Sequence, residues 1–216
     1  MALKGVSGKT LAEFAAVCRR AADMGLMRCS SGNLSMRIDR ERFLVKASRS
    51  WMARLTAEDV SLCAIRDGAL LGGPKPSVEL RFHAGVLRTR PDVNVVLHFQ
   101  TPFATALGCR RRRAINYFVI PEIPFYIGPI ARVPYLQPGS EALARAVVRA
   151  MREHDMVVMS NHGQVTAARD ADRAIQNAVF FELACEIILR VGSDLAPLPP
   201  AEAKALLALR KAAAGV

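Results

Sequence analysis

A chain of 216 residues, of which 51% are apolar, can bury the core of one mixed α/β domain. The longest apolar stretch near its end, residues 178–191, is interrupted every fourth residue by Glu182, Glu186 and Arg190, which predicts an amphipathic helix and excludes a membrane span. The five cysteines never pair as CxxC, which argues against a disulfide framework or a zinc ribbon. With no secretory signal pattern at the start, we expect a cytoplasmic protein.

The formal net charge of +11 raises the question of nucleic-acid binding, and the run Arg110–Arg113 is the segment that could support it. No aromatic residues interleave with that run, and no helix-turn-helix, RNP or KH pattern is present. The charge therefore indicates a preference for anionic substrates, and we expect neither a nucleic-acid nor a membrane partner.

The first part of the chain alternates short strand patterns with two helix patterns. Thr10 and Glu13 form a capping box that predicts the first helix, and Ser77 is expected to cap the second, which Pro91 ends. In chain order the pattern predicts a helix over residues 11–24, strands over 33–38, 43–47 and 60–65, and a helix over 78–90.

The remainder of the chain continues with both kinds of element. In order, it predicts a strand over residues 93–99, a helix over 101–109, further strands in the proline-rich segment 115–138, a helix from 139 to about 153, strands over 156–160 and 164–168, a long helix to 190, and a last helix from about 201. No repeat or linker divides the chain. We expect a single domain over residues 1–216, an α/β layered fold with a central, mainly antiparallel sheet flanked by helices.

Two of the four histidines lie where reactive groups usually collect. His98 ends a strongly apolar strand, and His162 lies in a tight turn, Asn161–His162–Gly163, between two strands. Such histidines can also be structural, and their spacing alone leaves metal binding open. His154 is expected to be solvated, and His83, one helical turn after Glu79, to be a partly buried helix residue.

Two further features could take part in chemistry. Glu79 is expected in the first turn of the helix that Ser77 caps, where the helix dipole keeps a carboxylate ionised and available as a base or ligand. Gly32–Asn33 forms a glycine-containing turn into a strand, and its backbone amides could hold an anion. Acidic residues are common in first turns, and glycine turns are common everywhere, so each pattern is weak alone.

Together, four separated motifs resemble the class II aldolase/adducin family, and most closely its L-fuculose-1-phosphate aldolase branch. They are residues 30–35 (SSGNLS), 75–83 (KPSVELRFH), 90–100 (RPDVNVVLHFQ) and 161–163 (NHG). The resemblance covers about residues 11–192. It implies a divalent metal ion, zinc or another, with His98, His162 and Glu79 as ligands, and Glu79 also as the catalytic acid and base. Gln100 stands where the family has a further ligand histidine and is itself a candidate ligand, so that Glu79 or Gln100 would complete the metal shell.

The resemblance also implies a phosphate site and an assembly. Gly32, Asn33 and Ser77 match phosphate-binding positions, while Ser48 and Arg49 stand where the family has a Thr-Gly loop. In that place Arg49 could contact the phosphate directly. Tyr117 corresponds to a tyrosine that donates a proton from the next subunit, and the family implies a homotetramer. The C-terminal tyrosine of the aldolase branch has no counterpart here, because no tyrosine follows Tyr135.

The function implied is metal-dependent cleavage of a ketose 1-phosphate, of the L-fuculose 1-phosphate type, to dihydroxyacetone phosphate and an aldehyde. The only lysine beside the candidate site, Lys75, lies in a Gly/Pro-rich loop, so a metal route is better supported than a Schiff base. Two alternatives stay open: a non-catalytic adducin-like binding or assembly module, and a related epimerase, dehydratase or decarboxylase with the same enolate chemistry.

Overall fold

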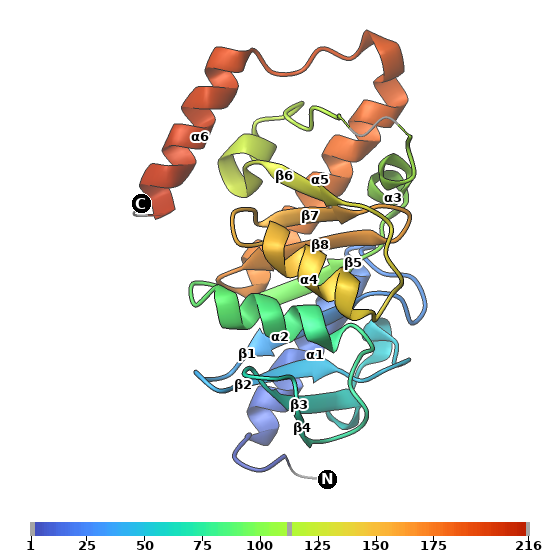
Figure 1. Ribbon diagram of the computed structural model, residues 1–216, viewed down its shortest axis with the longest axis vertical. Coiled ribbons are helices and arrows are strands. Elements are labelled where there is room, and N and C mark those ends of the chain that lie inside the picture. Colours follow the sequence, from blue (N-terminus) through green and yellow to red (C-terminus); the bar gives the residue numbers. More distant parts are fainter. Residues whose placement is uncertain (1–2, 112–113, 215–216) are drawn as a thin grey trace.

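In the computed structural model, which describes residues 3–111 and 114–214, all named strands join one sheet in the order β4-β3-β2-β1-β5-β8-β7-β6 (Figure 1). The strands are β1 (Asn33–Arg37), β2 (Arg42–Lys46), β3 (Val60–Ala64), β4 (Leu70–Gly72), β5 (Val95–Phe99), β6 (Ile130–Val133), β7 (Met156–Met159) and β8 (Gly163–Ala168). Only β6 and β7 pair in parallel, so the expected fold class, with its mainly antiparallel sheet, is confirmed.

Helices cover both faces of the sheet (Figure 1). They are α1 (Gly8–Asp23), α2 (Leu80–Thr89), α3 (Pro102–Gly108), α4 (Glu141–Ala150), α5 (Ala171–Val191) and α6 (Pro200–Ala214). One hydrophobic core joins the sheet to α1, α3 and α5, and the other joins it to α2 and α4. Because side chains alternate along a strand, Leu97 of β5 enters the first core, while Val96 and His98 face α2.

The proline-rich segment differs most from the sequence prediction. Within residues 115–138 only β6 is a strand, and Ile123–Ile127 forms a π-helical turn, η3, instead. Prolines 121, 124, 129 and 134 explain this, because a proline cannot donate to a strand ladder and so restricts pairing to the short stretch between Pro129 and Pro134. The short edge strand β4 was not predicted, since its three residues have no alternating pattern.

Two predicted helix starts are also shifted. Ser7, and not Thr10, caps α1, because the Ser7 hydroxyl accepts a hydrogen bond from the Thr10 amide and the helix begins at Gly8. α2 begins at Leu80, so Glu79 is its N-cap residue and lies just before the first turn. Ser77 accepts a hydrogen bond from the Glu79 amide at 3.3 Å and thereby fixes the backbone at this position.

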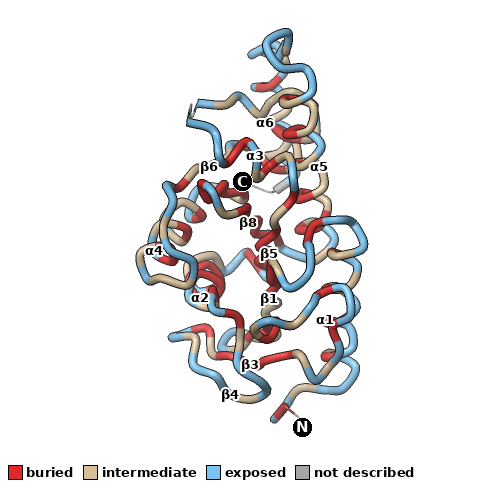
Figure 2. The backbone as a smooth tube through the Cα atoms, turned by 90° about the vertical axis from the view of Figure 1, so that its right-hand side faces the viewer, coloured by how far each residue is buried: buried red, intermediate tan, exposed pale blue. Residues whose placement is uncertain are grey.

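The C-terminal helix α6 lies beside the body of the fold and packs mainly on η3 (Figure 1). Most of α6 is exposed or half-buried (Figure 2). Arg210 fastens it by an ion pair to Asp155. None of the helices in the described part of the chain has the length and apolar character that a bilayer crossing requires. The single domain expected over all 216 residues stays a prediction.

Candidate metal centre and active site

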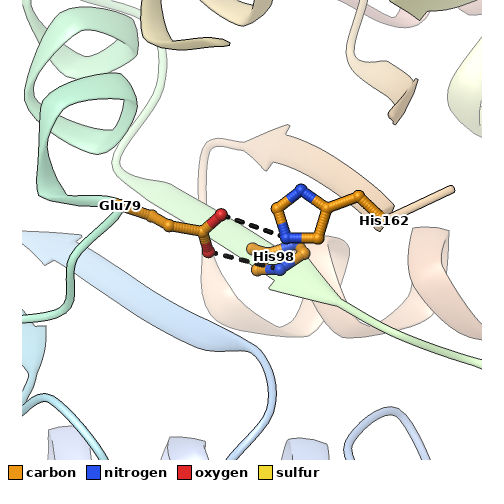
Figure 3. A group of neighbouring side chains, drawn as sticks. All are labelled: Glu79, His98 and His162. Carbon is orange, nitrogen blue, oxygen red and sulfur yellow. Dashed lines mark ion pairs between the residues drawn. The ribbon is translucent and has the colours of Figure 1, made fainter. Parts of the chain in front are cut away.

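Three separate elements bring Glu79, His98 and His162 together (Figure 3). Glu79 enters from the start of α2, His98 from β5, and His162 from the turn between β7 and β8. Strand pairing sets this arrangement, because β5 lies beside β8, with His98 opposite Val165. Glu79 Oε2 lies 3.3 Å from His98 Nε2, and Glu79 Oε1 lies 3.2 Å from His162 Nε2. The side chains are 1%, 5% and 10% exposed for His98, Glu79 and His162, so the group is shielded from bulk water.

The hydrogen bonds of this group fit a bound cation. His98 Nδ1 lies 2.8 Å from the carbonyl oxygen of Gln164 and must donate to it, because a carbonyl only accepts. In the neutral imidazole, Nε2 then has only a lone pair, and this lone pair faces a carboxylate oxygen. Among the described residues, Glu79 Oε1 is buried without any hydrogen-bond donor. A lone pair on His98 Nε2 that faces a carboxylate oxygen, together with a buried oxygen that has no partner, is an arrangement that a bound cation would satisfy.

The charge states favour the same interpretation. Burial alone would raise the pKa of the Glu79 carboxyl, but His98, the hydrogen bond from Asn33, and His162 and His83 hold that pKa below its ordinary value. Burial, together with His98, lowers the pKa of His162, although Glu79 opposes this shift. The site therefore presents one carboxylate and two imidazoles, which is a donor set suited to zinc and similar divalent ions.

Asn33 and His83 form a hydrogen-bonded chain that ends on Glu79. The Asn33 side-chain amide donates to Glu79 Oε2 at 2.9 Å, and its oxygen is hydrogen-bonded to His83 Nε2. The Asn33 carboxamide is thus engaged within the protein, and a phosphate contact from it stays a prediction. His83 is fully buried, and not partly buried as expected, with its other ring nitrogen 2.7 Å from the Ser35 hydroxyl.

The three loops assigned to phosphate binding meet around a buried lysine. Lys46, at the end of β2, donates to the carbonyls of Ser30 and Gly32 at 3.0 and 3.1 Å. The Ser77 amide donates to the Lys46 carbonyl, and the Ser48 amide donates to the carbonyl of Lys75. The segments that contain Gly32, Ser48 and Ser77 are therefore neighbours. The sequence did not identify Lys46, because its strand pattern cannot distinguish a buried lysine from an exposed one.

Gly32 itself is required by the turn. Its φ is +68°, and a Cβ at this position would lie 2.8 Å from the His98 carbonyl oxygen. Three other residues with side chains also have positive φ: Cys29 at 55°, Arg49 at 64° and Asn161 at 56°. All three lie in loops that surround the site. Such conformations cost free energy and persist only where the surrounding contacts enforce them, and they are found most often at functional sites.

Gln100 and Tyr117 occupy different positions relative to the metal group. A Cβ built on Gly163 would lie 2.8 Å from Gln100 Cγ and 2.9 Å from His98 Cε1, so the Gln100 side chain starts next to His98 and the His162 turn. Tyr117 packs on Phe181 of α5, and burial raises the pKa of its hydroxyl. Its role at a neighbouring subunit's site stays a prediction. His154 Nδ1 is hydrogen-bonded to the Ala150 carbonyl at 3.0 Å, beside the end of α4.

Comparison with known proteins assigns the chain to a protein family. Residues 12–189 match the model of the class II aldolase and adducin N-terminal domain. The chain belongs to this family. The resemblance drawn from the four motifs is therefore confirmed. The family uses a divalent metal, and Glu79, His98 and His162 form a group that could hold one.

Individual relatives of this family carry different activities. The chain is 31% identical to the 3-oxo-tetronate 4-phosphate decarboxylase of Haemophilus influenzae, over 82% of this chain and 85% of that protein. It is 29% identical to the L-fuculose phosphate aldolase of Methanococcus maripaludis, over 81% of this chain and 93% of that protein. Among solved structures it resembles YgbL of Escherichia coli, a putative aldolase/epimerase/decarboxylase, with a TM-score of 0.85 and 25% identity over 90% of this chain and 96% of the other.

Proposed function

We propose that this protein is a metal-dependent carbon–carbon lyase that decarboxylates a phosphorylated 3-oxo sugar acid of the 3-oxo-tetronate 4-phosphate type. The observation that carries the proposal is the buried Glu79 carboxylate, which faces the Nε2 atoms of His98 on β5 and of His162 in the turn between β7 and β8. A divalent metal bound there, zinc or another, would polarise the substrate carbonyl and stabilise the negative charge that develops on its oxygen.

The two activities named among the relatives form the same product fragment. In a ketose 1-phosphate, breaking the bond between C3 and C4 leaves an electron pair on a carbon that has a hydroxyl and adjoins a carbonyl. In 3-oxo-tetronate 4-phosphate, breaking the bond between C1 and C2 leaves an electron pair on an equivalent carbon. Both fragments become dihydroxyacetone phosphate after protonation. One site can therefore serve either reaction, and only the departing group differs, an aldehyde in one case and carbon dioxide in the other.

The residues of this chain have separable tasks in that reaction. Glu79 is the carboxylate of the metal group and is ionised at rest, so we assign to it the relay of a proton from water to the carbon that loses its bond. The turn at Gly32 and Asn33, with Ser48, Arg49 and Ser77, would hold the phosphate. Binding energy from the phosphate then fixes the reacting carbons relative to Glu79.

The departures from the aldolase motifs favour decarboxylation. An aldehyde forms only if a group removes the proton of the hydroxyl on the departing carbon, whereas carbon dioxide leaves from a carboxylate that is already ionised. Within residues 1–216 the resemblance gives no counterpart for the C-terminal tyrosine of the aldolase branch. Gln100 also replaces a ligand histidine, so the metal would have fewer nitrogen ligands and would attract electrons more strongly.

Aldol cleavage of a ketose 1-phosphate of the L-fuculose 1-phosphate type is the second candidate. It is supported by the Methanococcus maripaludis relative, which is 29% identical. Tyr117, reaching a neighbouring subunit of a homotetramer, would supply the missing proton transfer for this route. An adducin-like assembly role without catalysis is less well supported, because a buried carboxylate oxygen without a donor costs free energy that a purely structural site has no reason to retain.

The experiment is a comparison of two substrates with one product assay. The purified protein, stripped with a chelator and reloaded with zinc, manganese or cobalt, is given 3-oxo-tetronate 4-phosphate or L-fuculose 1-phosphate. Dihydroxyacetone phosphate is measured in both reactions. We expect release from the 3-oxo acid that depends on the metal. Faster release from the ketose 1-phosphate would favour the second candidate, and no release from either would contradict a lyase on these substrates.

A further inference from the structure

A chain of buried side chains runs from Ser35 on β1 to Glu79 at the metal group. The Ser35 hydroxyl lies 2.7 Å from His83 Nδ1, and His83 Nε2 is hydrogen-bonded to Asn33 Oδ1. Asn33 Nδ2 lies 2.9 Å from Glu79 Oε2. Ser35 and His83 are fully buried, and Asn33 and Glu79 are each 5% exposed, so water does not compete for these bonds.

Hydrogen-bonding rules give this chain a single direction. A carboxylate can only accept, so the Asn33 amide nitrogen donates to Glu79 and the Asn33 oxygen is left as an acceptor. His83 Nε2 must then carry the ring proton and donate it to that oxygen. The remaining nitrogen, Nδ1, has only a lone pair in the neutral ring and accepts from the Ser35 hydroxyl. Every hydrogen bond therefore points from Ser35 toward Glu79.

The direction matters because a side-chain amide can turn over. If the Asn33 carboxamide rotated by 180°, its oxygen would face the Glu79 carboxylate and its NH2 group would face the His83 N–H. Two acceptors would then meet at Glu79, and two donors would meet at His83. His83 thus selects the orientation of Asn33 that directs an N–H group at Glu79 Oε2. That bond holds one oxygen of Glu79, while the other, Oε1, faces His162.

We propose that His83 is a positioning residue, which acts through Asn33 to fix the carboxylate of Glu79 for metal binding and proton transfer. The proposal rests on the function proposed above, because it gives Glu79 its task. A different assignment would make His83 a core residue whose polar atoms are merely satisfied. The two assignments differ in what happens at Glu79 when the ring is replaced without loss of packing.

Three variants separate the assignments. His83→Phe keeps an aromatic ring, which can still stack on Phe82 as His83 does at 4.7 Å between ring centroids, but it cannot donate to Asn33. His83→Gln retains an N–H at about the place of Nε2 and should restore that donor. Ser35→Ala is the matched control, because it removes a buried hydrogen bond from the other side of His83 and leaves the bonds to Asn33 and Glu79 in place.

The variants are compared by kcat and KM on the substrate that releases dihydroxyacetone phosphate, by metal dissociation constant and by melting temperature. For His83→Phe we expect a loss of about 10- to 100-fold in kcat, in metal affinity or in both, with KM changed little, as is usual when a residue that supports a metal ligand is lost. His83→Gln should recover most of that loss. Ser35→Ala should lower the melting temperature about as much as His83→Phe does, because each change removes a buried hydrogen bond. It should change kcat and metal affinity less than about threefold.

A metal-free measurement keeps this proposal separate from the proposed function. In the NMR spectrum of the wild type, the Asn33 side-chain amide protons should exchange slowly with water, and they should exchange fast in His83→Phe and slowly again in His83→Gln. If the wild type releases no product, the lyase assignment fails, yet this amide signal still tests the chain of bonds. Equal effects of His83→Phe and Ser35→Ala on kcat, metal affinity and amide exchange, or no recovery with His83→Gln, would overturn the positioning role.

Discussion

Glu79 and Asp155 are both acidic residues set between two basic side chains, but their surroundings differ. Asp155 accepts a hydrogen bond from Arg90 at 2.9 Å on one oxygen and pairs with Arg210 through the other. Arg90 also pairs with Asp92 at 2.7 Å, and these bonds raise the pKa of its guanidinium. Glu79 instead faces His98, whose Nε2 is an acceptor in the neutral ring, and His162, whose Nδ1 has no hydrogen-bond partner among the described residues. Glu79 Oε1 has no hydrogen-bond partner there either.

This difference supports a structural role for Asp155 and the functional role that we propose for Glu79. An arginine brings permanent charge and N–H donors, so the pairs at Asp155 are complete within the protein and fasten α6 to the fold. His98, whose donor nitrogen is already used, offers Glu79 only a lone pair, and Glu79 Oε1 and His162 Nδ1 have no hydrogen-bond partner among the described residues, so the group around Glu79 has capacity left for a cation. The number of neighbouring basic residues is the same, and the hydrogen-bond direction decides the role.

The largest effect is expected from Glu79→Gln. This change preserves the shape of the side chain but removes the group that transfers the proton, so kcat should fall by roughly 10²- to 10⁴-fold. Metal affinity should fall too, because an amide is a weaker ligand than a carboxylate, but His98, His162 and the amide oxygen should still allow the variant to be loaded at higher metal concentration. The measurement is the rate of dihydroxyacetone phosphate release with the metal content determined in the same sample. Unchanged kcat in a metal-loaded variant would rule out Glu79 as the proton carrier.

Gln100→His is expected to increase zinc affinity, because the side chain at position 100 starts next to His98. Zinc prefers nitrogen to an amide oxygen, so a histidine here should tighten zinc binding roughly tenfold, which corresponds to about 1.4 kcal/mol. Competition with a chromogenic chelator measures the dissociation constants of wild type and variant. Equal or weaker zinc binding in a correctly folded variant would show that residue 100 does not reach the ion.

Asp155→Asn tests the structural side of the comparison. It removes the charge that Arg90 and Arg210 share, and with Asp155 21% exposed we expect a loss of about 1 to 3 kcal/mol in the free energy of unfolding. The melting temperature should fall by roughly 2 to 10 °C, while kcat of the folded protein stays within about twofold. A selective loss of kcat with an unchanged melting temperature would contradict the division between the two acidic residues.

The smallest effect is expected from replacing Arg110 and Arg111 by Gln together. Both are exposed, and the carbonyl of Arg110, not its side chain, accepts the hydrogen bond from Arg132. Arg112 and Arg113 of the same run lie outside the described residues. Activity should stay within about twofold, as is usual for surface substitutions. Tight, salt-dependent binding of DNA or RNA by the wild type, lost in this variant, would overturn the expectation of no nucleic-acid partner.

The predicted site residues that the structure brings together are those whose position depends on local structure. His98 at a strand end, His162 in a turn and Glu79 beside a helix start could each be recognised from nearby residues and from the family motifs. The partners of Asn33 could not, because the residue is 46 positions from Glu79 and 50 from His83, and only the packing of α2 on β1 brings them together. Lys46 was missed because a strand pattern does not distinguish a buried lysine from an exposed one, and its partners Ser30 and Gly32 lie 16 and 14 positions away.

Segment 115–138 shows a different limit. Its apolar and aromatic residues suggested strands, but the prolines permit only β6 and a π-helical turn, and the packing of α6 on that turn involves residues more than 70 positions away. Local patterns record which residues prefer strands. They do not record which neighbours are available to pair with them, and this decides the structure of a proline-rich segment.

A metal titration tests the central claim most directly. The chelator-stripped protein is titrated calorimetrically with zinc, manganese and cobalt, alongside His162→Ala, which removes one of the three ligands. We predict that the wild type binds one divalent ion per chain and that the variant loses this binding, because opening a small ligand shell removes most of its affinity. Absence of binding in the wild type, or undiminished binding in His162→Ala, would contradict a metal centre at Glu79, His98 and His162.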